Sequence, residues 1–116
     1  MYMKMKDIIS NPIICKINFD CDSVWKGKLC SCEAIQMRYL KDSLRIIKDA
    51  KLNAYVEPLA IDWITVWIYK YDYMCEVIKN LPDNPTTVFE HWILGKAFGY
   101  SDEAIKDFIS PYLTKK

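Results

Sequence analysis

The sequence predicts a mainly α-helical domain: a compact four-helix fold with a short N-terminal β-hairpin-like appendage and a C-terminal helix-turn-helix-like corner. Apolar residues recur at spacings of three and four after residue 32, helix caps and breakers divide that region, and the first 32 residues lack a helical period. The chain has 116 residues, of which 52% are hydrophobic, and this suffices for one packed core. We therefore expect a single domain over 1–116, with an irregular, β-like segment over 1–32 and a helical core over 33–116.

The N-terminal segment alternates in polarity. Apolar Cys15, Ile17 and Phe19 alternate with polar residues, and a period of two is typical of a half-buried strand. Turn-forming residues follow from Asp20 onward. The chain is therefore expected to return through Trp25–Leu29 as a short hairpin.

The first predicted helix covers about residues 32–52. Ser31 is a plausible cap at its start, and Asn53 is a plausible stop. One apolar stripe follows spacings of three, four and three, and it consists of Met37, Leu40, Leu44 and Ile47.

The second predicted helix begins at Pro58, which suits a first helical position because the missing amide proton has no partner there. It runs to about Leu81, and apolar residues cover most of its circumference, which predicts the central element of the core. The β-branched and aromatic stretch 64–69 favours a strand instead, an alternative ranked second because no turn divides the segment. The predicted core centres on Leu40, Leu44, Trp63, Ile64, Trp67, Ile68, Phe98 and Ile105.

Capping residues define the third and fourth predicted helices. Thr87 and Glu90 have the spacing of a capping box, in which each side chain accepts from a free amide of the first turn. Gly99 ends the third helix in a left-handed conformation. Ser101 caps a short fourth helix, and Pro111 is expected to limit its end.

The segment Trp92–Ile109 resembles a helix-turn-helix, with Gly95 where the two helices approach. The inward positions are Leu94, Phe98, Ile105 and Phe108. The exposed face would carry Asp102, Glu103 and Asp107, and carboxylates repel DNA phosphates. An ordinary helix corner is the simplest interpretation, and an acidic face that docks on a basic protein surface is the preferred functional one.

A basic ridge is predicted along the first helix. It consists of Arg38, Lys41, Arg45 and Lys48. The ridge is a second candidate partner-binding surface and the place where nucleic acid could bind. The alternative is a solvated face, in which Asp42 and Asp49 form ion pairs with the ridge. Residues 1–56 carry a net charge of +4 and residues 57–116 carry −3, so charge is segregated along the chain.

Four thiols within eighteen residues raise the question of a zinc site. They are Cys15, Cys21, Cys30 and Cys32. The spacing lacks the two-residue gap of a zinc knuckle, so buried free cysteines are the favoured interpretation. We expect no metal, no cofactor and no enzymatic activity, since His91 is the single histidine and no catalytic motif accompanies it.

The segment His91–Ile105, together with Lys/Ile/Tyr/Asn-rich usage throughout, resembles small accessory proteins of phages and mobile elements of low-GC Gram-positive bacteria. This resemblance implies stoichiometric binding, as in anti-CRISPR and other anti-defence inhibitors. The expected partner is a host protein or ribonucleoprotein complex that the chain binds and inhibits, and a homodimer is left open. The alternatives are a helix-turn-helix-like DNA-binding transcriptional regulator and, third, a zinc-binding interaction module.

The cytoplasm of the host cell is the expected location. Five cysteines are an odd number, and the N-terminus lacks the apolar core of a secretory signal. The longest apolar run, 58–69, is shorter than the roughly 18 to 20 residues of a membrane span. We therefore expect no membrane association.

Overall fold

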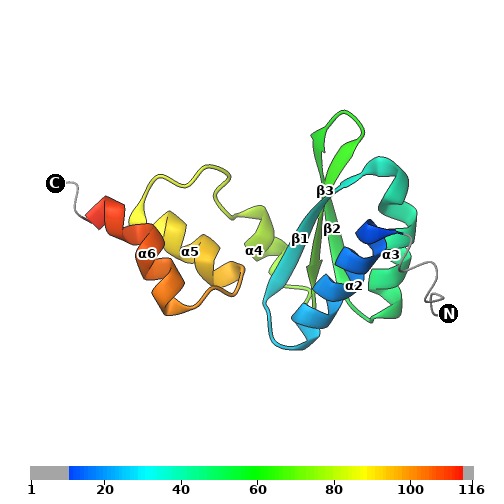
Figure 1. The fold of residues 1–116 in the computed structure, drawn as a ribbon, viewed down its shortest axis with the longest axis horizontal. Helices are drawn as coiled ribbons and strands as arrows, with labels where there is room; N and C mark the ends of the chain where they lie inside the picture. Colours follow the sequence, from blue (N-terminus) through cyan, green and yellow to red (C-terminus); the bar gives the residue numbers. More distant parts are fainter. Residues whose placement is uncertain (1–10, 114–116) are drawn as a thin grey trace.

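The computed structural model describes residues 11–113, and within them the fold is α+β, so the predicted mainly α-helical fold is wrong. A three-stranded antiparallel sheet lies between α2 and α3 on one side and α4 on the other, and α5 and α6 form the far end of an elongated molecule (Figure 1). In chain order the elements are α2 (Pro12–Trp25), β1 (Cys30–Gln36), a 3-10 turn (Met37–Tyr39), α3 (Leu40–Asp49), β2 (Asn53–Ala60), β3 (Trp63–Tyr69), α4 (Met74–Lys79), α5 (Val88–Ala97) and α6 (Asp102–Leu113).

Strand β3 is central, because the strand order is β1-β3-β2. The predicted helix over 58–81 is therefore wrong, and the strand alternative for 64–69 is confirmed. The chain reverses between β2 and β3 at Asp62, which has a left-handed φ of 62°. Ile64, Val66 and Ile68 are buried on one face of β3, and Trp67 and Tyr69 are buried on the other. A strand buried on both faces has no polar side, and this explains why it is mistaken for a buried helix.

The predicted N-terminal strand is also wrong, because these residues form α2. The Asn11 side chain accepts hydrogen bonds from the amides of Ile13 and Ile14, and Pro12 occupies the first turn. The residues that face the core follow helical spacing and are Ile14, Ile17, Cys21 and Val24. Phe19, predicted to lie on the buried side of a strand, is 70% exposed.

Only the second part of the predicted helix over 32–52 is helical. The first part is β1, whose residues pair with β3 from Cys30 to Gln36. The predicted stripe is correct in part, because Ile47 is buried and Leu40 packs against the core, while Ile46 is buried beside them. Met37 and Leu44 are exposed instead.

The second face of the sheet is covered by α4 and the end of α5. Its buried residues are Cys30, Trp67, Tyr69, Met74, Ile78 and Ala97. The ring of Phe98 stacks on Trp67 with 5.8 Å between centroids. The indole N–H of Trp67 donates to Glu57 Oε1 at 2.8 Å, so this buried polar group is satisfied.

The predicted core is therefore correct in part. Ile64, Trp67, Ile68 and Ile105 are buried, and Leu40 and Phe98 pack against the core while partly exposed. Trp63, at 41% exposure, and Leu44 are not core residues. Trp63 begins β3 beside the hairpin turn, beyond the area that the helices cover.

The two C-terminal helices confirm the predicted caps. Thr87 Oγ1 accepts from the Glu90 amide at 3.1 Å, and Ser101 Oγ accepts from the Ala104 amide at 3.2 Å. The Glu90 carboxylate accepts from the Thr86 amide, which lowers the pKa of Glu90. Pro111 does not end α6, since the helix continues to Leu113.

One charged residue is buried between α2 and β1. The carboxyl of Asp20 is almost inaccessible, its Oδ2 accepts no hydrogen bond from any residue between 11 and 113, and the carboxyl of Glu33 lies close enough to act on its pKa. Burial, followed by hydrogen bonding with Glu33 and the charge of Glu33, raises the pKa of Asp20 to about 7, although the charges of Lys28 and Lys16 oppose this shift.

We expect Asp20→Asn to remove a pH dependence of stability. The folded protein holds a proton on Asp20 that the unfolded chain, with a carboxyl pKa near 3.9, releases. The stabilisation by this proton is complete below pH ~4 and is lost as the pH rises through about 7. An asparagine can donate to Glu33 at every pH. At pH 8 the free energy of unfolding of the variant should therefore exceed that of the wild type by on the order of 2 to 4 kcal/mol.

Urea unfolding between pH 4 and 8 measures this difference. Asp22→Asn is the matched control, because Asp22 is exposed and pairs with Lys26 at 2.8 Å, so its loss should cost less than about 1 kcal/mol. An unchanged pH profile in Asp20→Asn would show that Asp20 carries no proton in the folded state.

Candidate protein-binding surface

The α5–α6 corner packs as its sequence predicts. A Cβ placed on Gly95 would lie 2.6 Å from Cγ1 of Ile105, so only glycine permits this close approach of the helices. Gly99 has a left-handed φ of 78°, and the Tyr100 amide donates to the Gly95 carbonyl at 2.9 Å. The predicted helix end and small-residue contact are confirmed.

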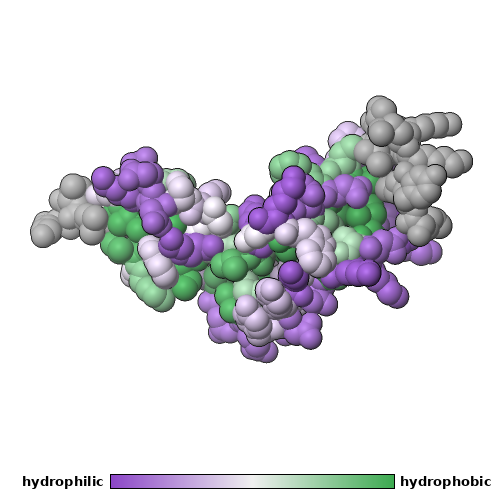
Figure 2. All heavy atoms as spheres, turned by 90° about the horizontal axis from the view of Figure 1, so that it is seen from below, coloured by the Kyte–Doolittle hydropathy of each residue, from purple (hydrophilic) through white to green (hydrophobic). Residues whose placement is uncertain are grey.

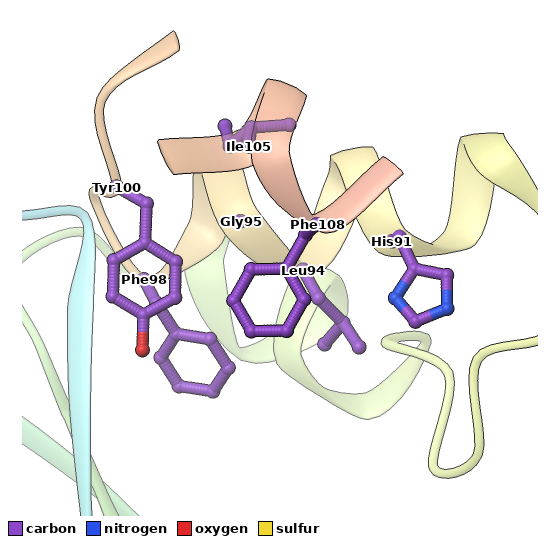
Figure 3. Close-up of a pocket in the computed structure, with 7 residues that line it drawn as sticks. All are labelled: His91, Leu94, Gly95, Phe98, Tyr100, Ile105 and Phe108. Atoms are coloured by element: carbon purple, nitrogen blue, oxygen red, sulfur yellow. The ribbon is translucent and has the colours of Figure 1, made fainter. Parts of the chain in front are cut away.

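A pocket of about 170 Å³ opens beside this corner (Figure 3). It is lined by His91, Leu94, Gly95, Phe98, Tyr100, Ile105 and Phe108. Figure 3 shows the Phe108 ring between Phe98 and His91, with Leu94 below it. A dry apolar cavity of about 150 Å³ binds a benzene molecule, so this pocket can accept one large apolar side chain.

Further apolar side chains are exposed on α5, on a side of the helix that does not line this pocket. Phe89 and Trp92 are exposed on α5, and their rings stack with 6.3 Å between centroids. Phe108, predicted to point inward, is 62% exposed at the pocket rim. Figure 2 shows apolar surface gathered over the α5–α6 end of the molecule. Contiguous apolar surface with a polar rim is typical of protein-binding sites.

The predicted acidic face lies on α6, and none of its residues lines the pocket. Asp102, Glu103 and Asp107 are all exposed on α6. The Lys96 ammonium binds the Asp102 carboxylate, which lowers the pKa of Asp102. Among residues 11–113, Glu103 and Asp107 form no ion pair, so these two carboxylates are the unpaired negative charges of the acidic face.

The predicted basic ridge lies at the other end of the molecule. Arg38 is in the 3-10 turn, and Lys41, Arg45 and Lys48 are on α3, across the sheet from α5 and α6 (Figure 1). All four side chains are exposed. Arg45 pairs with Asp42 at 3.2 Å, as the alternative of a solvated face predicts, and the Arg38 guanidinium lies 4.8 Å from the ring centre of Tyr39. The structure does not join the acidic face and the basic ridge into one surface.

The candidate zinc ligands lie apart. Cys21 is buried in the core between α2 and the sheet, whereas Cys30 and Cys32 belong to the opposite face of the sheet. Within the described range 11–113, no three His, Cys, Asp or Glu side chains are grouped so that they could hold a metal ion. Burial raises the pKa of Cys21 and of Cys30 to about 11, which disfavours the thiolate that ligation and nucleophilic attack require.

Sequence reasoning missed the aromatic surface on α5. Phe89 and Trp92 lie three residues apart and therefore share one side of a helix, a pattern present in the sequence. Their exposure follows from the position of α5, which meets the sheet only near its C-terminal end at Ala97 and Phe98. No sequence pattern specifies that position.

Comparisons of this chain with protein-family models, with curated proteins and with solved structures find no match. None of the helices between residues 11 and 113 has the length and apolar character needed to cross a membrane.

We expect Gly95→Ala to destabilise the protein by about 1 to 3 kcal/mol, because the new methyl group would overlap Ile105. Denaturant unfolding of a double-mutant cycle with Ile105→Ala measures the effect. In the Ile105→Ala background the added methyl group has space, so Gly95→Ala should no longer lower the free energy of unfolding. Equal costs in both backgrounds would contradict the close approach of the helices.

Proposed function

We propose that this protein is a non-enzymatic binding protein that inhibits a host defence complex by attaching its α5–α6 corner to a protein component of that complex. The observation that carries the proposal is the apolar pocket at the corner, which the exposed rings of Tyr100 and Phe108 line. The pocket suits a partner that inserts one large apolar side chain, and the carboxylates on the exposed side of α6 suit lysine or arginine elsewhere on that partner.

The position of the charges favours a protein partner over duplex DNA at this corner. In a helix-turn-helix the second helix faces the phosphates and base edges of the major groove. Here that helix presents Asp102, Glu103 and Asp107 against one cation, Lys106. The basic ridge cannot compensate, because α3 lies across the sheet from α6 (Figure 1). The role in defence inhibition rests on the sequence resemblance to phage and mobile-element proteins.

Site-specific photocrosslinking tests the docking surface. A photoreactive phenylalanine analogue at Phe108 should crosslink a partner in a lysate of a low-GC Gram-positive host. The same analogue at Phe19 is the matched control, because the two side chains have similar exposure, 62% and 70%, and lie on different elements. We expect a crosslink from position 108, absent from position 19, that maps to a partner segment rich in lysine and arginine.

Charge reversal gives the second comparison. The triple variant Asp102→Lys, Glu103→Lys, Asp107→Lys should bind that partner about tenfold or more weakly. The double variant Lys41→Glu, Arg45→Glu on the ridge should bind it as the wild type does. Capture that survives the acidic-face change, or is lost with the ridge change, would contradict docking through the corner. The inhibitory role is measured in cells that carry a CRISPR system. Expression of the wild-type chain should abolish CRISPR interference, and expression of the acidic-face variant should leave interference intact.

A further inference from the structure

A second cavity, which shares no lining residue with the α5–α6 pocket, lies where the end of α2 meets the end of β3 and the start of α4. Its volume is about 190 Å³. It is lined by Val24, Trp25, Gly27, Lys28, Leu29, Lys70, Tyr71 and Met74. Two aromatic rings and two ammonium groups therefore line this cavity, and no carboxylate does.

The aromatic rings are held in place while remaining exposed. The Trp25 indole N–H donates to the carbonyl of Ala50 at 2.7 Å, which fixes the ring against the end of α3. Tyr71 is 54% exposed and stacks on Tyr73, with 5.7 Å between centroids and 7° between planes. Fixed, accessible rings offer a stacking surface at little entropic cost.

The cations of the cavity lack acidic partners. The Lys70 ammonium lies 4.4 Å from the ring centre of Trp25 and 5.4 Å from that of Tyr71. Neither Lys28 nor Lys70 forms an ion pair with any residue between 11 and 113. The charge of Lys28 acts at longer range, where it opposes the rise in the pKa of Asp20, Cys30 and Cys32.

The acids nearest in sequence are already engaged. Asp22 pairs with Lys26 at 2.8 Å. Asp72 accepts a hydrogen bond from the Asn53 side-chain amide at 3.1 Å. The cavity therefore combines aromatic faces with positive charge, which selects a ligand that is both planar and anionic.

We propose that this cavity binds a nucleotide unit, with the base stacked on Trp25 or Tyr71 and the phosphate bound by Lys70 and Lys28. A cavity of about 150 Å³ holds benzene, so the volume suits one base. Lys70 is exposed on a flexible four-carbon chain, and its ammonium can leave the Trp25 face for a phosphate when a base arrives. Aromatic stacking with nearby cations is the usual recognition of single-stranded nucleic acid, and a free nucleotide shares the same chemistry.

Fluorescence anisotropy of a labelled single-stranded oligothymidine of about 12 nucleotides tests the proposal on the full chain. We expect saturable binding at about 50 mM salt that weakens as salt rises. Lys70→Glu and Tyr71→Ala, both at exposed positions, should each lower the affinity about tenfold. The matched controls Lys48→Glu on the ridge and Tyr100→Ala at the α5–α6 pocket should leave it unchanged.

Competition with AMP distinguishes the two sources of the ligand. If AMP displaces the oligonucleotide at a concentration equal to that of its nucleotide units, the ligand of the cavity is a free nucleotide. If AMP displaces it only at higher concentration, the ligand is a single strand. Two results would overturn the proposal: no binding of either probe at low salt, or binding that Lys70→Glu and Tyr71→Ala leave intact. The partner crosslink at Phe108 is a separate readout, so either proposal can fail without the other.

Discussion

The fold depends on β3 being buried on both faces. Its alternate side chains contribute to two separate cores: Ile64, Val66 and Ile68 pack against α2 and α3, while Trp67 and Tyr69 pack toward α4 and the end of α5. A three-stranded sheet has little stability alone, and helices on both faces supply the apolar burial that it lacks. Both halves of the molecule are therefore attached to one seven-residue strand.

The same burial explains which parts of the fold the sequence could predict. Helices α5 and α6 were predictable, because the hydroxyl caps Thr87 and Ser101 and the glycine Gly99 are local devices that act within a few residues. Strand β3 was not, since its polarity has no period of two once both faces are covered. The cap Asn11 with Pro12 marked the start of α2 just as clearly, but the alternation over 15–19 was given more weight.

The candidate sites show a similar division. Exposure of Asp102, Glu103 and Asp107 followed from helical periodicity and local caps, and so did that of the ridge on α3. The pocket and the cavity could not be predicted, because each depends on tertiary contacts. Trp25 and Lys70 are 45 positions apart in the sequence, and they meet because α2 and the end of β3 lie together.

The attachment of the corner also places the two sites next to each other. The Cys30 thiol donates to the Ala97 carbonyl at 3.3 Å, and this bond joins the first residue of β1 to the last of α5. Beside it, the Lys28 stem packs so closely on Gly99 that an added Cβ would lie 3.2 Å from its Cγ. Gly99 is favoured by its left-handed φ, and a larger residue there would also displace the Lys28 side chain slightly. Because Lys28 also lines the cavity, a ligand that draws its ammonium inward acts on a side chain that supports the turn between α5 and α6. Lys28 is therefore the one residue of this cavity that also lies against Gly99 of the corner.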